Sequence, residues 1–192
     1  MNETRPSPVA PICLVVGAVL GLGGSFAPSA SLRGLAWGID GIALVVAAAL
    51  LAAHLLRRGQ DTAAAGFLIF IAGQSLVVSG SALSLEASAA VFGAGAGLWA
   101  AALLVISVPD LMPKAIRVVG CVAALLFAAT AVQIFAGRSL TPLSEPLPFF
   151  AYPLLWSPCL VGHGGAGSQR QRHDATTLRS AQALAAGGPN AA

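Results

Sequence analysis

The sequence predicts an all-α polytopic membrane protein, a transmembrane helical bundle of six spans with both termini in the cytoplasm. Composition is the first observation behind this prediction: 57% of the residues are hydrophobic, only 9% are charged, and the mean hydropathy is +0.84. A water-soluble domain usually carries about 25% charged residues, so this chain cannot cover an apolar core with a water-compatible surface. The other two observations are the lengths of the apolar stretches and the placement of the basic residues around them.

Six apolar stretches are candidates for crossing the bilayer. A span needs about 20 apolar residues to cross ~30 Å of hydrocarbon, and it must be helical because lipid offers no hydrogen-bond partner to backbone groups. The predicted spans are residues 9–26, 35–56, 63–83, 87–108, 115–136 and 147–161. Residues 1–8 form a cytoplasmic N-terminal segment, and residues 162–192, rich in Gly, Ala, Gln and Ser, form a flexible cytoplasmic tail.

Turn-forming and charged residues separate these stretches. The first break contains Pro28, Ser29 and Ser31, and the later breaks are residues 57–61, 84–86, 109–114 and 137–146. The connection between the third and fourth spans is so short that these two spans must form an antiparallel hairpin.

The sixth span is short and contains Pro148, Pro153 and Pro158, of which the last two interrupt helical hydrogen bonds. The basic residues support it nonetheless. With six spans, eight Lys and Arg residues lie on the cytoplasmic side and only Arg33 and Arg138 lie outside, whereas five spans would divide them five against five. Because cytoplasmic loops carry an excess of Lys and Arg, we expect a bacterial inner-membrane protein whose last span is kinked by proline.

The first stretch has an alternative interpretation as a cleaved signal peptide. Arg5 precedes the apolar run, and Ser25, Phe26 and Ala27 resemble a small-residue cleavage site. The run is longer than a usual signal-peptide core, however, and Pro28 would directly follow the cut. We therefore expect the segment to be retained; its cleavage would leave five spans in the same orientation.

Ionisable side chains are nearly absent from the predicted spans, and none lies at the bilayer midplane. Asp40, near the outer end of the second span, is expected either to reach the interface or to form a buried pair with Arg33 or Arg138 beside a cavity. Proton relays and ion-coupled exchangers place charged groups near the middle of a span. Neither mechanism is favoured here.

Gln74 lies near the centre of the third span and needs a hydrogen-bond partner there. One interpretation is an interhelical hydrogen bond that holds the bundle together. The other is a polar path for a solute or water, with Ser79 on the same span and Gln133 and Thr130 of the fifth span as companions.

Glycines recur at helical spacing and predict close helix packing, because a helix without Cβ atoms on one face can approach its neighbour closely. The third span carries three glycines at intervals of seven residues, and the first and fourth spans each carry a GxxxG pair. These residues are Gly66, Gly73, Gly80, Gly17, Gly21, Gly93 and Gly97.

Motifs typical of catalysis or metal binding are absent from the sequence. No nucleophile elbow, HExxH or phosphate-binding loop is present, and Cys13, Cys121 and Cys159 are isolated within apolar stretches. We therefore predict no catalytic site, metal or cofactor. The net charge of +3, without a basic cluster, does not indicate nucleic-acid binding.

Two functional hypotheses remain. The first is a non-enzymatic accessory or scaffold protein, or a self-associating helical bundle, whose partners are the lipid bilayer and a second copy or another membrane protein. The second is a small neutral-solute transporter or channel with a polar path near Gln74. An enzyme ranks third because few reactive groups can converge.

Overall fold

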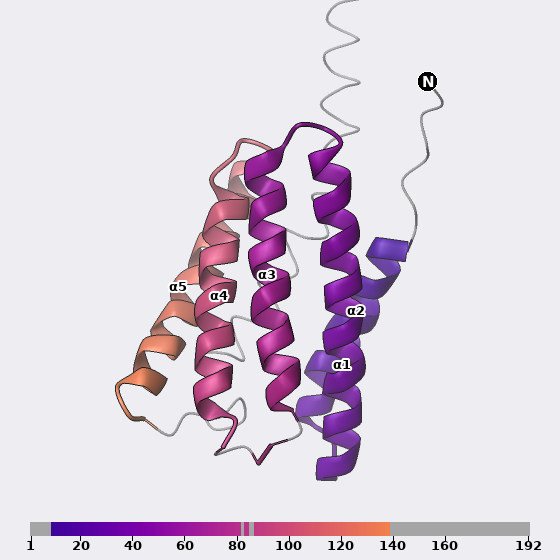
Figure 1. Cartoon of the computed structure of the whole chain (residues 1–192), viewed down its shortest axis with the longest axis vertical. Coiled ribbons are helices and arrows are strands. Elements are labelled where there is room, and N and C mark those ends of the chain that lie inside the picture. The colour runs from indigo at the N-terminus through magenta and orange to yellow at the C-terminus, as the bar shows by residue number, and fades with distance from the viewer. Residues whose placement is uncertain (1–8, 82, 85–86, 139–192) are drawn as a thin grey trace, which may run out of the picture.

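Every secondary-structure element in the described part of the chain is an α-helix. The computed structural model describes residues 9–81, 83–84 and 87–138. The helices are α1 (Val9–Ser25), α2 (Ala30–Leu56), α3 (Asp61–Gly80), α4 (Ala89–Ser107) and α5 (Lys114–Phe135) (Figure 1). Helices α2 to α5 are long and apolar enough to cross a membrane, and α1 is a shorter apolar helix of 17 residues. The all-α class is thus confirmed for the described residues, and the four long apolar helices support the predicted membrane-spanning character, while the predicted span 147–161 lies outside the described residues.

Helix boundaries differ from the predicted spans most at the start of α2, which begins at Ala30 rather than at residue 35. Ser29 explains the difference: its backbone is extended and its side chain accepts a hydrogen bond from the backbone N–H of Leu32 at 3.2 Å. A serine in this position satisfies one of the free N–H groups of the first helical turn. Ser29, interpreted as part of a turn, is therefore the N-terminal cap of the helix, and Ser31 lies in its first turn.

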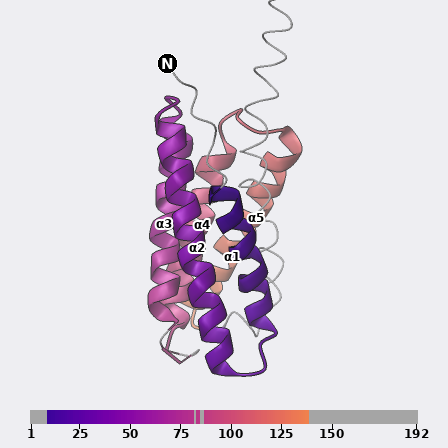
Figure 2. The same ribbon diagram turned by 90° about the vertical axis from the view of Figure 1, so that its right-hand side faces the viewer.

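The helices form an up-and-down series in which each packs against its neighbours in sequence. Contacts join α1 to α2, α2 to α3, α3 to α4 and α4 to α5, and these are the only contacting pairs among the described helices. Helices α2, α3 and α4 lie side by side (Figure 1), and α1 and α5, which pack against α2 and α4, both lie on the same side of this layer (Figure 2). The α1–α2 and α3–α4 connections lie at one end of the bundle, and the α2–α3 and α4–α5 connections lie at the other.

Glycine brings α3 and α4 together along their length. A Cβ atom built on Gly66 would lie 2.6 Å from Cγ1 of Ile106, a distance that real Cβ atoms essentially never show, and 3.2 Å from the carbonyl oxygen of Ala102, which is tighter than most real contacts. Nearer the other end of the contact, Gly73 faces Gly95 and Trp99 of α4. Close backbone approach gains dispersion contacts, which replace the hydrophobic drive that is absent between helices in lipid.

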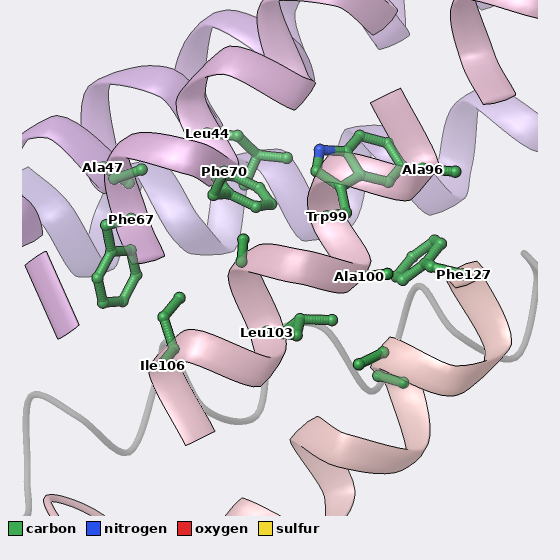
Figure 3. Packing of buried hydrophobic residues seen from close by; sticks show 14 of the residues in the cluster. Leu44, Ala47, Phe67, Phe70, Ala96, Trp99, Ala100, Leu103, Ile106 and Phe127 are labelled. Atoms are coloured by element: carbon green, nitrogen blue, oxygen red, sulfur yellow. The ribbon is translucent and has the colours of Figure 1, made fainter. Parts of the chain in front are cut away.

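Aromatic rings fill the space between α3, α4 and α5. The Trp99 side chain is fully buried, and its ring centroid lies 5.2 Å from that of Phe127, 6.2 Å from that of Phe70 and 6.3 Å from that of Phe92. The Phe127 and Phe92 rings meet Trp99 edge to face, a favoured arrangement of aromatic pairs. Figure 3 shows Trp99 between Phe70 and Phe127, with Leu103 and Ile106 further along α4.

Arg117 joins the beginning of α5 to the end of α4. Its guanidinium donates hydrogen bonds to the carbonyl oxygens of Ser107 and Val108, each at 2.8 Å, and it forms an ion pair with Asp110. The last carbonyl groups of a helix have no partner within the helix, and the helix dipole favours a positive charge there. Arg117 therefore caps α4.

Large apolar side chains also cover the outside of the bundle, on every described helix. Exposed examples are Ile12, Val19, Leu35, Ile42, Leu68, Leu104, Val118, Leu125 and Val132. Water would not tolerate apolar surface distributed in this way, whereas lipid tails solvate it. The outer surface thus fits contact with a lipid bilayer.

Candidate functional site

A cavity of about 80 Å³ lies between the ends of the first four helices, on the side of the α1–α2 and α3–α4 connections. Each of these helices contributes to the lining, and so do residues next to the α3–α4 connection. The lining residues are Gly21, Leu22, Ser25, Trp37, Asp40, Gln74, Val77, Val78, Gly80, Ser81, Leu83, Ser88 and Phe92. Two of them are Asp40 and Gln74, the polar residues predicted from the sequence at separate places in the second and third spans.

Asp40 enters the cavity from α2 and is almost completely buried, with 3% of its surface exposed. Gly21 of α1 makes room for its carboxyl group: a Cβ atom at that glycine would lie 2.9 Å from Oδ2 and 3.1 Å from Cγ of Asp40. Oδ1 of Asp40 has no hydrogen-bond partner in the described structure. The pairing with Arg33 or Arg138 that the sequence suggested does not occur among the described residues, where the one ion pair joins Arg117 and Asp110.

Gln74 enters the same cavity from α3 and is 2% exposed. Gly41 of α2 lies opposite: a Cβ atom there would lie 3.3 Å from Nε2 of Gln74 and would overlap the side chain of Val78. Oε1 of Gln74 is buried and has no hydrogen-bond partner in the part of the chain that is described. The structure therefore brings two unpartnered oxygen acceptors, Asp40 Oδ1 and Gln74 Oε1, to one cavity.

Trp37 and Phe92 contribute the aromatic part of the lining. The indole Nε1–H of Trp37 donates to the carbonyl oxygen of Gly21 at 3.1 Å, which fixes the ring against α1. Gly24 leaves space for that ring, because a Cβ atom at Gly24 would lie 2.6 Å from Cδ1 of Trp37. The orientation of Trp37 is therefore set by two glycine positions on α1.

Serine hydroxyls at the rim of the cavity bond to their own helices. Ser25 donates to the carbonyl oxygen of Gly21 at 3.5 Å, and Ser81 donates to that of Val78 at 2.6 Å. Such bonds satisfy a hydroxyl within the helix that carries it. Their protons are thus directed toward the backbone rather than toward a bound molecule.

Other members of the predicted polar path lie elsewhere. Ser79 is exposed and donates to the carbonyl oxygen of Leu76 at 2.7 Å, on a side of α3 away from Gln74. Gln133 accepts a hydrogen bond from Arg138 at 3.1 Å, and the buried hydroxyl of Thr130 donates to the carbonyl oxygen of Leu126 at 2.9 Å. Both are on α5, which among the described helices contacts only α4. The structure therefore brings Gln74 and Asp40 to the same cavity, and neither Ser79 nor Gln133 lines it.

The remaining glycines selected from the sequence lie at helix contacts or close to them. Gly17 is buried on α1, as is Gly21. A Cβ atom at Gly93 would lie 2.9 Å from Cγ2 of Ile134 on α5, whereas one at Gly97 would make an ordinary contact of 3.7 Å with Ala131. Gly80 faces Val91 and Ser88 at 3.4–3.5 Å.

The cavity combines polar and aromatic side chains. Its lining contains a carboxyl group, an amide, hydroxyls and aromatic rings, and no Lys, Arg or His. Within the described residues, no three His, Cys, Asp or Glu side chains gather as a metal site would require, and Cys13 and Cys121 are free thiols. The chain matches no family model, no curated protein and no solved structure.

Proposed function

We propose that this protein is a small-solute transporter of a cell membrane and that the cavity at Asp40 and Gln74 is its substrate site. The observation that carries the proposal is the pair of buried, unpartnered acceptors, Asp40 Oδ1 and Gln74 Oε1, in one cavity of about 80 Å³. A closed core around Gln74 would have favoured a purely structural role for it. The absence of enzymatic activity stays a prediction.

Energetics support a binding role for these two side chains. A buried acceptor without a partner destabilises a protein by about 1–3 kcal/mol, and in a membrane span polar groups are rare unless they serve a function. A structural glutamine would be expected to bond to a neighbouring helix, yet Gln74 Oε1 has no such bond in the described structure. A solute that donates hydrogen bonds would supply the missing partners.

The residues around the cavity support entry of a solute from one side of the membrane. The exposed residues Ser81 and Leu83 lie at its rim, next to the α3–α4 connection. In the other direction α1 and α2 pack through buried apolar residues, among them Leu14, Leu44 and Leu51. This arrangement suits an open state on one side of the membrane, with passage requiring rearrangement of that packing.

The positions of the basic residues indicate on which side of the membrane the cavity opens. The end with the α2–α3 and α4–α5 connections carries four of them, namely Arg57, Arg58, Lys114 and Arg117. Arg33 and Arg138 lie toward the opposite end. By the positive-inside rule the first end faces the cytoplasm of a bacterial inner membrane, so the cavity opens to the outside. The cytoplasmic placement of both termini also requires the sixth span.

Solute uptake into proteoliposomes tests the proposal. The wild-type protein is expected to take up one or more solutes from a panel of small polar molecules, and Asp40→Asn and Gln74→Leu are expected to reduce that uptake roughly tenfold or more, since each removes an acceptor. Ser79→Ala and Gln133→Leu are the matched controls, because these side chains lie outside the cavity. A folded wild-type protein that takes up nothing across the panel would refute the transporter.

Self-association is a second candidate function, and it is favoured by a GxxxG pair on α2. Nothing in the described chain lies within 4 Å of a Cβ atom built on Gly34 or Gly38, so this glycine face has no partner inside the bundle. In lipid such faces pair with a second helix. The double variant Gly34→Leu, Gly38→Leu should convert a dimer to a monomer in cross-linking experiments, with Gly23→Leu as control. A monomeric wild-type protein would eliminate this candidate.

A further inference from the structure

We propose that the solute bound at Asp40 and Gln74 is a small organic cation that carries N–H donors, such as a primary ammonium or a guanidinium ion. This inference rests on the proposed function and names its substrate class. It also changes the neutral solute expected from the sequence, because the structure places a carboxyl group beside Gln74.

Hydrogen bonding in the cavity favours a donor. Asp40 Oδ1 and Gln74 Oε1 are both acceptors, and both are unsatisfied within the described chain. Three donors of the lining are already used, since the Trp37 N–H and the Ser25 hydroxyl bond to Gly21 and the Ser81 hydroxyl bonds to Val78. A ligand that brings several donors satisfies this site, whereas a ligand that brings only acceptors leaves it unsatisfied.

Charge selects a cation among such donors. The lining contains one carboxyl group and no basic side chain, so an anion would meet repulsion without compensation. A buried carboxylate is strongly disfavoured unless it is paired with a positive charge. Asp40 forms no ion pair in the described structure, and a bound ammonium or guanidinium would provide that charge through hydrogen bonds strengthened by ionisation.

The aromatic part of the lining fits the same ligand. Trp37 and Phe92 line the cavity together with Asp40, and Trp37 is held in place by its bond to Gly21. The face of an aromatic ring attracts cations, most strongly in the case of tryptophan, and this attraction increases where water is excluded. A carboxyl group and aromatic rings thus surround the same space.

Volume limits the size of the cation. The cavity of about 80 Å³ has space for roughly five to eight water molecules, if each needs about 10–15 Å³. Ethylammonium and guanidinium fit this space, and long polyamines do not.

Calorimetric titration of the full-length protein in lipid nanodiscs tests the inference without any substitution. Ethylammonium and guanidinium chloride are expected to bind, each at least tenfold more tightly than tetramethylammonium, which has the charge but no N–H donor. Ethanol, a neutral donor, and acetate, an anion, are expected to give no measurable heat of binding. Equal affinity for ethylammonium and tetramethylammonium would overturn the inference, and so would measurable binding of either ethanol or acetate.

Variants then locate the site. Asp40→Asn keeps the shape of the side chain and removes its charge, and it is expected to weaken ethylammonium binding at least tenfold. Asp110→Asn is the matched control, because Asp110 lies on the α4–α5 connection at the other end of the bundle and is expected to leave binding unchanged. Unchanged affinity in a folded Asp40→Asn protein, shown by its helical circular dichroism, would refute the assignment.

Failure of the inference and failure of the proposed function give different results. Specific ethylammonium binding that depends on Asp40, without uptake into proteoliposomes, supports the cation site and contradicts transport. Uptake of a neutral solute that depends on Gln74, without binding of either cation, supports transport and contradicts the cation site.

Discussion

A methyl group built on Gly73 would lie 3.0 Å from the carbonyl oxygen of Gly95, and one built on Gly95 would lie 3.0 Å from the carbonyl oxygen of Gly73. The backbones of α3 and α4 thus meet at two glycines that each make room for the other. Because the obstructing atoms belong to the backbone, they cannot rotate away as the end of a side chain would. The two helices would have to separate to accommodate either methyl group.

Alanine at Gly73 is therefore expected to destabilise the protein by about 1–3 kcal/mol, the usual cost of overpacking. The measurement is reversible unfolding in mixed micelles, followed by helical circular dichroism. Gly97→Ala is the control, because its methyl would make an ordinary 3.7 Å contact with Ala131. Equal stability of the two variants would contradict the close contact of α3 and α4.

Gly21→Ala is expected to reduce solute uptake roughly tenfold, since displacing the carboxyl group of Asp40 disrupts its proposed charge-assisted hydrogen bond to the bound solute. The new methyl would lie 2.9 Å from Oδ2 of Asp40, so the carboxyl group must move. Gly23→Ala, on the same helix, has nothing within 4 Å of the new methyl and should transport normally. Equal initial uptake rates for the two variants would show that the position of Asp40 does not matter.

Phe127→Ala is expected to destabilise the protein less than the same substitution does in the core of a water-soluble protein, where the loss is about 3–5 kcal/mol. The substitution removes the edge-to-face contact with Trp99 and leaves a void, but the unfolded helix in lipid keeps an apolar environment for its side chain. Thermal unfolding in detergent gives the value. Phe135→Ala, at a lipid-exposed position, should have almost no effect, and a comparable loss there would contradict this account.

Arg117→Met is expected to destabilise the α4–α5 connection by about 1.5–3 kcal/mol, the usual value of hydrogen bonds to a charged group. The variant keeps an apolar stem and removes the bonds to the Ser107 and Val108 carbonyls. Asp110→Asn removes only the ion pair, whose carboxylate is 92% exposed, so it should cost less than about 1 kcal/mol. Hydrogen exchange at the end of α4 would reveal the difference, and equal exchange in both variants would argue against the cap.

The sequence predicted the helices well because their lengths are set by lipid thickness and their ends by turn-forming residues. The start of α2 was missed because Ser29 was interpreted as part of a turn, although serine is also a preferred helix cap. Composition and residue spacing indicate where helices begin and end. They do not indicate which helices pack against each other.

The site was predicted only in part, because composition and spacing do not specify how the helices pack against one another. Asp40 and Gln74 were each selected, but their meeting depends on the packing of α2 against α3, which no local pattern specifies. Ser79 could have been excluded from the start, because five residues turn it about 140° around the helix from Gln74. Ser81, seven residues from Gln74, returns to the same face and does line the cavity.

The packing of each described helix against only its neighbours in sequence has a consequence for biogenesis. Helices enter the membrane in the order of synthesis, so each finds its docking surface already present and few contacts wait for distant parts of the chain. All the side chains of the cavity belong to α1 through α4 and their connections. Every residue of the cavity lining is therefore synthesised before any residue of α5.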